Sequence, residues 1–451
     1  MARIRVPIPF TELMEKVSNE VFIPLLSKYK ATDLQGNYLH WDKFKWKVDT
    51  GDDEDAAWIA TKISRNSTKK YIAKLQGKNE GELFSYCVPD SLFSQLHYID
   101  TLTGGGHSIG DGAFITTREK DKYLVKNLIM EEAITSSQLE GASTTRKVAK
   151  DMLENNRKPI NKSEQMIFNN YLLMKKVVER KDEDLSIGLI LELHSIATFE
   201  AIDNDAISGE LRIDNDITIR NGYNEVAHEP PSFESLKERL TLLCQFANEC
   251  SDGKNSDTFI HPLIKAITLH FMIGYIHPFG DGNGRTARAL FYWFMLRSGY
   301  WLFEYVSISK LIQEKRSDYD AAYIYTESDD LDLTYFIYHQ VDIVIKAVDA
   351  LQKHIASKKG EFYQFMEWID KSPLSKKLKR TQLELLKDAI KEPGKIFTAK
   401  QVSAEFDINQ NTARTYLNGL VDEDLLISTR SKKGKMILYL APSGLRDKLK
   451  I

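Results

Sequence analysis

Cysteine is scarce in this sequence of 451 residues, and its pattern excludes two kinds of small scaffold. The three cysteines are Cys87, Cys244 and Cys250, and no two of them form a C-x-x-C pair. This pattern argues against a disulfide framework and against a zinc ribbon, and it fits a reducing compartment. Long apolar runs are also missing, so we expect no transmembrane helix and no membrane partner. The first residues lack the apolar core of a signal peptide, and we therefore expect a cytoplasmic protein.

A strong net charge is absent from the chain as a whole, which carries a formal charge of -3. The charge is nevertheless unevenly spread. Residues 371–451 contain 17 Lys and Arg against 9 Asp and Glu, a net of +8, and the first 370 residues therefore carry -11. Such asymmetry suggests that the two parts have different partners.

The length predicts roughly two to four domains, and the composition suggests where they lie. Strand and turn signals, as in residues 66–84, predict a mixed α/β region over residues 1–120, without long helices. A glycine-rich loop at 103–112 lacks the Gly-Lys-Ser/Thr ending of a P-loop, so a flexible loop is a better interpretation than a phosphate cradle. We expect a helical domain over 121–355, a polar, basic linker over 356–380 and a further domain over 381–451. The predicted fold class is mainly α.

The helical domain contains one segment with a different pattern. Residues 216–231 alternate apolar and polar side chains around Asn221-Gly222, which predicts a β-hairpin. The segment 261–276 is apolar nearly all round and predicts a buried central helix. The other expected helices cover 163–180, 185–200, 232–250, 284–299 and much of 308–355.

The last segment has the element order of a winged helix-turn-helix domain. A helix at 381–391 is followed by Thr398 as a helix cap, a helix at 409–421 and two strands. In such a domain, helix 409–421 enters a DNA groove and the wing touches phosphates. Many winged helices bind proteins instead, and the acidic end of this helix would repel a DNA backbone, so both partners stay open. The wing lysines are Lys432, Lys433 and Lys435; the acidic residues are Asp422, Glu423 and Asp424.

The densest chemistry lies in the twelve residues His277-Pro-Phe-Gly-Asp-Gly-Asn-Gly-Arg-Thr-Ala-Arg288. Its glycines permit positive φ and close backbone approach, and they precede the start of a helix, where anions bind. Asn283 adds an amide donor. Arg285 and Arg288 share one helix face, which suits a polyphosphate. The three glycines are Gly280, Gly282 and Gly284.

Two further residues complete this pattern. Asp281 is an anion in a cationic surrounding, which makes sense if it holds Mg²⁺ together with substrate phosphates and waters. His277 can take a proton from an incoming hydroxyl, and Phe279 should pack inward. A lone histidine or a lone G-x-G is usually structural. The joint arrangement predicts a phosphorus-transfer site.

The motif resembles the signature of the Fic family, His-x-Phe-x-(Asp/Glu)-Gly-Asn-Gly-Arg-x-x-Arg, and meets every specified position. Gly209-Glu-Leu-Arg212 resembles a further family element, and hairpin 216–231 resembles the Fic flap, which binds a target backbone by strand addition. The resemblance covers about residues 120–350. It implies a Fic-type helical fold and transfer of AMP from ATP to a Ser, Thr or Tyr hydroxyl of a target protein or of the enzyme itself. Family members often dimerise, although nothing in the sequence fixes an interface.

The resemblance also implies a role for each motif residue. His277 is the base and Asp281 the Mg²⁺ ligand. Asn283 and the loop amides hold the α-phosphate of ATP, and Arg285 and Arg288 take the β- and γ-phosphates. Tyr319 or Tyr323 is a candidate for adenine contact, with aromatic core packing as the alternative. The candidates for target contact on the flap are Ile217, Thr218, Ile219 and Tyr223, with His228 beside them.

A helix expected at about 128–141 carries Ser136, Glu140 and Gly141 in the order of the Fic inhibitory motif, (Ser/Thr)-x-x-x-Glu-(Gly/Asn). In such proteins the Glu pairs with the second motif arginine, here Arg288. A desolvated pair of this kind is worth ~1.5–3 kcal/mol. The same Glu aligns water for AMP removal in some members, and taken alone the segment would be an ordinary amphipathic helix.

Two other functions stay open. A nucleotide-sensing, DNA-binding regulator would not need an intact base, and a Fic-type phosphotransferase would lack the second glycine-arginine pattern. His277, Gly284-Arg285 and Arg288 are all present and favour AMP transfer.

Overall fold

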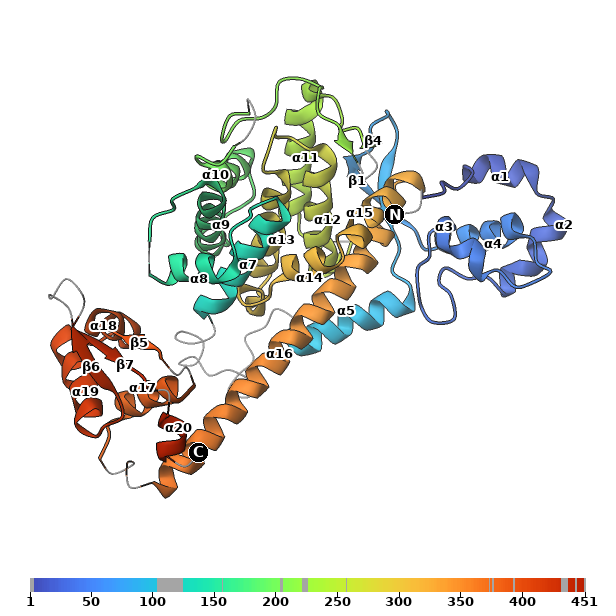
Figure 1. Ribbon diagram of the computed structural model, residues 1–451. Coiled ribbons are helices and arrows are strands. Elements are labelled where there is room, and N and C mark those ends of the chain that lie inside the picture. Colours follow the sequence, from blue (N-terminus) through green and yellow to red (C-terminus); the bar gives the residue numbers. More distant parts are fainter. Residues whose placement is uncertain are drawn as a thin grey trace. The chain divides into compact units, whose positions relative to one another are not determined.

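The computed structural model divides the chain into two compact units, Met1–Leu351 and Gln352–Ile451. Both are mainly helical, as the sequence predicts (Figure 1). Residues 1–103 belong to the same unit as the central helices, and the segment expected as a linker, 356–380, is helical as far as Lys371 because α16 spans Thr334–Lys371. The described residues are 4–103, 125–155, 157–202, 206–220, 226–256, 258–372, 374, 377–391, 394–430, 437–442 and 444–449.

The first part of the larger unit combines helices with one hairpin. Strands β1 and β2 pair antiparallel, with Lys70 opposite Tyr86, which agrees with the predicted strands. The expectation that long helices are absent here is wrong for α4 and for α5, which have 13 and 14 residues. Helix α4 begins at an Asp53 cap and buries Trp58 and Ile59. The elements are α1 (Phe10–Lys16), α2 (Asn19–Phe22), the 3-10 helices η1 (Ile23–Ser27) and η2 (Lys45–Lys47), α3 (Trp41–Phe44), α4 (Glu54–Asn66), β1 (Lys70–Gln76), β2 (Leu83–Tyr86) and α5 (Asp90–Thr103).

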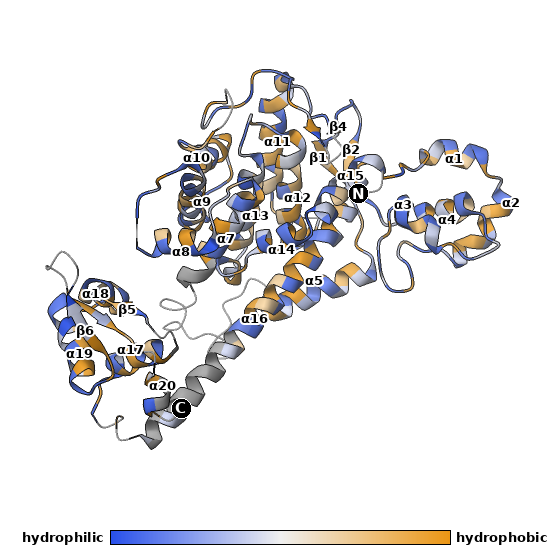
Figure 2. Ribbon diagram, in the orientation of Figure 1, coloured by the Kyte–Doolittle hydropathy of each residue, from blue (hydrophilic) through white to orange (hydrophobic). Residues whose placement is uncertain are grey.

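Two consecutive helices form the centre of this unit. All residues of α12 (Pro262–Ile276) except Pro262 and Gly274 are buried, which confirms the predicted central helix. The following helix, α13 (Asn283–Arg297), is buried almost as completely. Figure 2 shows the distribution of hydrophobic and hydrophilic residues over the surrounding helices. These are α7 (Val125–Leu139), α8 (Arg146–Glu154), α9 (Lys162–Glu179), α10 (Ile187–Thr198), η4 (Phe233–Ser235), α11 (Leu236–Asn248), η5 (Trp301–Glu304), α14 (Ile308–Glu314) and α15 (Arg316–Ser328).

The predicted hairpin within 216–231 is present on both of its described sides. Strand β3 (Ile219–Arg220) pairs antiparallel with β4 (Val226–His228), and Ile219 lies opposite His228. Tyr223 falls outside the described residues, as does the predicted glycine-rich loop beyond Thr103.

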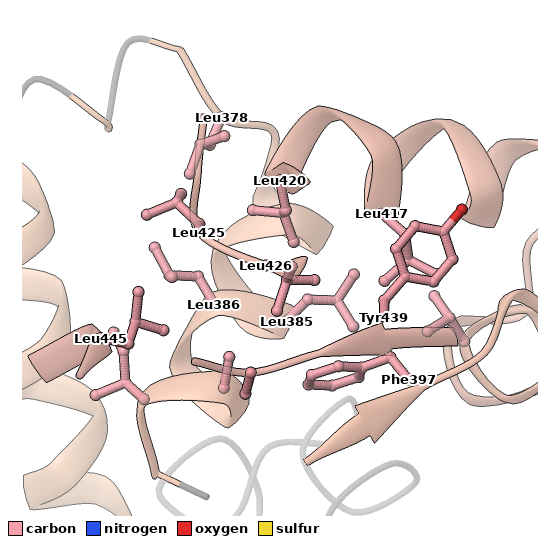
Figure 3. Packing of buried hydrophobic residues seen from close by; sticks show 14 of the residues in the cluster. Leu378, Leu385, Leu386, Phe397, Leu417, Leu420, Leu425, Leu426, Tyr439 and Leu445 are labelled. Atoms are coloured by element: carbon pink, nitrogen blue, oxygen red, sulfur yellow. The ribbon is translucent and has the colours of Figure 1, made fainter. Parts of the chain in front are cut away.

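The smaller unit packs helices on a three-stranded sheet of order β5-β7-β6. Figure 3 shows leucines of α17 and α19 gathered against Phe397 and Tyr439 of the sheet. Thr398 caps α18 through its side chain, as predicted, and the wing lysines lie outside the described residues. The elements are α17 (Arg380–Lys391), β5 (Ile396–Phe397), α18 (Ala399–Phe406), α19 (Gln410–Asp422), β6 (Ile427–Arg430), β7 (Ile437–Leu440) and α20 (Leu445–Leu449). Among all the described helices, none combines the length and the apolarity needed to cross a membrane.

Candidate active site

His277 lies where α12 ends and the chain turns into the motif loop. Its backbone is left-handed, with φ 48° and ψ 58°, a conformation that is uncommon outside glycine. The ring Nδ1 lies 3.2 Å from the carbonyl oxygen of Gly274. Because a carbonyl only accepts hydrogen bonds, Nδ1 carries the ring hydrogen and Nε2 keeps its lone pair. Burial lowers the pKa of His277 to about 4, although the Gly274 carbonyl opposes the shift. The ring is therefore neutral near pH 7, with Nε2 able to accept a proton.

The loop that follows His277 is held by hydrogen bonds to its backbone. Arg212 Nε donates to the His277 carbonyl, and the Arg212 amide donates to that of Pro278, both at 2.9 Å. The side chain of Asn283 both accepts from the amide of Phe279 and donates to its carbonyl, at 3.0 and 2.7 Å. Asn283 thus braces the loop in this structure, and its contact with the α-phosphate stays a prediction.

His194, on α10, is a positioning residue that sequence reasoning missed. Its ring stacks on buried Phe279 at 3.6 Å between centroids. Nδ1 accepts from the amide of Gly209 at 3.0 Å, so Nε2 carries the hydrogen and donates to the Asp281 carbonyl at 2.9 Å. Burial lowers the pKa of His194 to about 4, which keeps this tautomer neutral. A single histidine on a helix, far from the motif in sequence, gave no signal for this contact.

Two motif glycines allow close approaches that a Cβ would prevent. Gly282 caps α13 with φ 79°, and a Cβ there would lie 2.5 Å from Cγ2 of Thr198. A Cβ on Gly284 would lie 2.2 Å from Oε1 of Glu140. The loop and the first turn of α13 therefore form a tight cradle, and a helix start of this kind favours anions.

Asp281 and Arg285 contact each other across this turn. Asp281 Oδ1 accepts from the amide of Gly282 at 2.6 Å, and Oδ2 lies 3.3 Å from Arg285 Nη2. Arg285 is fully buried and donates through Nη1 to the Ala197 carbonyl, while its Nε has no hydrogen-bond partner among the described residues. Burial lowers the pKa of Arg285, and Asp281 opposes the shift. One buried guanidinium donor of Arg285 is therefore unpaired among the described residues.

The residues around Asp281 fit a cation that the substrate helps to bind. The side chain of Asp281 is 34% exposed, so its carboxylate is accessible. No group of three or more His, Cys, Asp or Glu that could hold a metal occurs within the described residues. A single carboxylate suits Mg²⁺, which takes its other ligands from phosphates and water.

Arg288 makes three hydrogen bonds to α7 and to Glu140, the residue that follows it. Nε donates to Ser136 Oγ at 2.9 Å, and Nη2 donates to the Ser136 carbonyl at 3.2 Å and to Glu140 Oε1 at 2.9 Å. Burial by itself raises the pKa of Glu140, but the charges of Arg288 and Arg285 outweigh it and lower that pKa. Glu140 is therefore ionised and paired with buried Arg288.

The chain just after α7 is fixed on two sides. Arg316 Nη1 of α15 donates to the Leu139 carbonyl at 2.9 Å. Gly141 has φ 98°, which lets the chain turn away beyond Glu140. These two features fix the turn that places the Glu140 carboxylate next to the cradle.

Comparison with known proteins identifies the domain that holds this cradle. Residues 184–295 match the sequence model described as the Fic/DOC family. This segment includes His194, Arg212 and the whole motif from His277 to Arg288. The chain contains a Fic/DOC family domain.

Relatives share this Fic domain over a limited length. The chain is 37% identical over 73 residues to "Protein adenylyltransferase Fic" of Nematostella vectensis, covering 16% of each protein. It is 34% identical over 119 residues to the protein of the same name in Drosophila sechellia, covering 26% of this chain and 21% of the relative. It is 31% identical over 124 residues to "Protein adenylyltransferase fic-1" of Caenorhabditis elegans, covering 28% and 22%. The matches therefore span about a fifth of these curated relatives or less.

A solved structure shares the fold over a larger part of the chain. A crystal structure of a Fic family protein from Desulfovibrio desulfuricans G20 matches with a TM-score of 0.50 at 18% identity. The match covers 79% of this chain and 97% of that protein. The Fic-type helical fold expected from the sequence is thus confirmed.

The two tyrosines proposed for the adenine end lie on α15, beyond the matched segment, and pack against α12. The Tyr319 hydroxyl lies 3.0 Å from His270 Nε2 and donates to that of Tyr323 at 3.4 Å. Tyr323 stacks on Phe271 at 4.8 Å. The structure thus places both rings in an aromatic cluster of α12 and α15. Adenine contact stays a prediction for the Tyr323 ring, which is half-buried, and for Tyr319, which is buried.

The flap residues divide into outward and inward groups. Thr218 is exposed, and Ile217 and Ile219 are half-buried, and their contact with a target backbone stays a prediction. His228 points the other way, and its two ring nitrogens contact Glu327 and the Tyr275 carbonyl. Both ring nitrogens of His228 are engaged within the larger unit, so its side chain is turned away from the exposed flap edge, and target contact by His228 stays an untested prediction.

Proposed function

We propose that this protein is a protein adenylyltransferase, which transfers AMP from ATP to a hydroxyl side chain of a target protein or of itself. The observation that carries the proposal is the neutral His277, whose Nε2 keeps its lone pair at the mouth of an anion cradle. Relatives that share the domain carry the name protein adenylyltransferase.

The chemistry follows from the positions of these groups. His277 Nε2 takes the proton of the incoming hydroxyl while its oxygen bonds to the α-phosphorus of ATP. The bond from that phosphorus to the β-bridging oxygen breaks, and pyrophosphate leaves. The amides at the start of α13, with Arg285 and Arg288, stabilise the charge on the phosphates. A magnesium ion held by Asp281 would neutralise phosphate charge when bound.

The Glu140 pair favours a protein that is inhibited by default. Arg288 is the second motif arginine, which the γ-phosphate requires, and its Nη2 is engaged by Glu140. The Glu140 carboxylate also fills the space beside Gly284 in the cradle. Placement of ATP for transfer therefore requires that this carboxylate leave Arg288.

One labelling experiment separates this proposal from its alternatives. The Glu140→Gly variant is incubated with Mg²⁺ and ATP labelled at either the α- or the γ-phosphate, with Glu140→Gly/His277→Ala as the inactive control. Label from the α-position on protein is the expected result. Label from the γ-position alone would mean a phosphotransferase, and no label would favour a nucleotide-sensing regulator. Loss of AMP from pre-labelled protein on addition of the wild type would show AMP removal.

We also propose that the smaller unit is a winged helix-turn-helix domain that contacts DNA. The support is the exposed polar face of α19, with Gln410, Asn411, Arg414 and Thr415 on the solvent side. The test is the fluorescence anisotropy of a labelled mixed-sequence duplex with the full chain at several salt concentrations. We expect binding that weakens with salt and is reduced by Arg414→Ala. Absence of binding at low salt would leave a protein partner as the better interpretation.

A further inference from the structure

His228 connects the flap to the helix that carries the catalytic base. It is the last residue of β4, and its side chain is only 9% exposed. Its Nε2 lies 2.7 Å from the carbonyl oxygen of Tyr275, in the last turn of α12. Its Nδ1 lies 2.6 Å from Oε2 of Glu327, on α15. One side chain thus joins three elements.

The chemistry of these contacts makes them directional. The Tyr275 carbonyl only accepts, so His228 Nε2 donates to it. The second hydrogen bond places one hydrogen between His228 Nδ1 and Oε2 of Glu327. The ring also packs on that of Tyr275 at 5.1 Å between centroids. Such a ring has little freedom to rotate, and it fixes β4 against α12.

This contact lies next to the reacting group in the chain. Tyr275 precedes His277 by two residues, so the carbonyl that holds the flap belongs to the turn that sets the backbone of the base. The opposite ends of the flap are held by Arg212, which donates to the carbonyls of Asp214 and Pro231 as well as to His277. Arg212 ties the ends of the flap, and His228 ties its second strand.

We propose that His228, held by Glu327, is a positioning residue that sets the distance between the target-binding strand and His277. This inference rests on the proposed adenylyltransferase function. The flap presents the acceptor hydroxyl, whereas the cradle binds ATP without it. Loss of the His228 contact should therefore impair transfer to protein and leave the handling of ATP intact.

The test uses the full chain with Glu140→Gly as the active parent and ATP labelled at the α-phosphate. Label on protein and label released as free AMP by attack of water are measured together. We expect His228→Ala and Glu327→Ala each to lower the ratio of protein-bound to free AMP by about tenfold or more. A misplaced acceptor hydroxyl slows transfer to protein and does not slow attack by water. The KM for ATP should stay unchanged.

Two further variants distinguish positioning from general damage. Glu327→Gln replaces the carboxylate by an amide of the same shape that can still hydrogen-bond to Nδ1, and it should retain most of the ratio. Combining His228→Ala with Glu327→Ala should lower the ratio no further than His228→Ala alone, because Glu327 acts through His228 and has no ring to hold once His228 is removed.

A matched control exists at the other end of the same helix. His261 caps α12, and its Nε2 lies 3.0 Å from Oδ2 of Asp100. His261→Ala should leave the ratio unchanged even if it lowers the melting temperature.

The outcomes keep the two proposals apart. No α-label on protein in the parent overturns the proposed function and this inference with it. Label in the parent with an unchanged ratio in His228→Ala and Glu327→Ala overturns the positioning role alone. Equal loss of both products and a raised KM for ATP would mean a structural role in the cradle, and would also overturn it.

Discussion

At the scale of single residues, the state of His277 predicts the pH dependence of the proposed AMP transfer. Burial lowers its pKa to about 4, and the neutral ring is the form that accepts a proton. Activity is therefore fully present above that pKa and is lost as pH falls through it. In the Glu140→Gly variant, we expect the rate of transfer to stay level from alkaline pH down to about 5, within about one unit of that pKa.

The measurement is a pH–rate profile taken on protein whose folded state is checked at each pH. A midpoint near the ordinary histidine value of about 6.5 would show that the ring is more solvated than its contacts indicate.

The Glu140–Arg288 pair predicts the size of the inhibition. A charge-assisted hydrogen bond of about 1.5–3 kcal/mol corresponds to a rate increase of about ten- to hundredfold when it is removed. We expect this gain in α-label transfer for Glu140→Ala. Glu131→Ala is the matched control, since Glu131 lies on α7, the helix that ends just before Glu140, and pairs with Arg146. Equal rates of α-label transfer in Glu140→Ala and Glu131→Ala would contradict an inhibitory role of Glu140.

At the scale of elements, the start of α13 depends on a glycine. Gly282 has φ 79°, and a Cβ would meet Thr198 at 2.5 Å, so Gly282→Ala should lower the free energy of unfolding by about 1–3 kcal/mol and abolish transfer. Gly188→Ala is the control, because a Cβ there meets only Ser186 Oγ at 3.7 Å within α10. The free energy of unfolding of both variants is measured by urea denaturation. A Gly282→Ala protein as stable as wild type would show that the side chain causes no backbone strain at this position.

Elements with strong local signals could be predicted from the sequence. Helix α12 and the hairpin around Asn221-Gly222 were predicted, because neighbouring residues determine both the apolar pattern of a buried helix and the turn of a hairpin. Helix α4 was missed in a region rich in strand and turn signals.

The motif identified the residues that form the cradle, but it could not identify the residues elsewhere in the chain that hold them in place. His194 and Arg212 act on Asp281 and His277 across the fold, and His228 turns inward because of Glu327. Such contacts join segments far apart in the chain, and no local pattern encodes them.

At the scale of the whole molecule, one buried ion pair ties the N-terminal region to the central helices. Lys62 of α4 lies 2.6 Å from Asp329, at the end of α15, and their side chains are 1% and 4% exposed. Removing one partner leaves a buried charge without its counter-ion. We expect Lys62→Ala to lower the free energy of unfolding by about 3–5 kcal/mol.

Lys28 provides the control for this pair. It contacts Asp49 and Asp52 at the surface, so Lys28→Ala should give no measurable loss. Denaturation curves that place both variants at the same midpoint would mean that the N-terminal region is held by packing alone.

The contact between Glu140 and Arg288 also has a consequence for how the occupancy of the cradle depends on the ATP concentration. On the proposed function, one guanidinium serves a tethered carboxylate and a diffusing nucleotide, and a tethered competitor has a fixed effective concentration. The ATP concentration needed for half occupancy is then raised by a constant factor, which the strength of the Glu140–Arg288 contact sets. The wild-type protein would thus couple its output to the energy state of its surroundings, with a midpoint set by the turn at Leu139–Gly141.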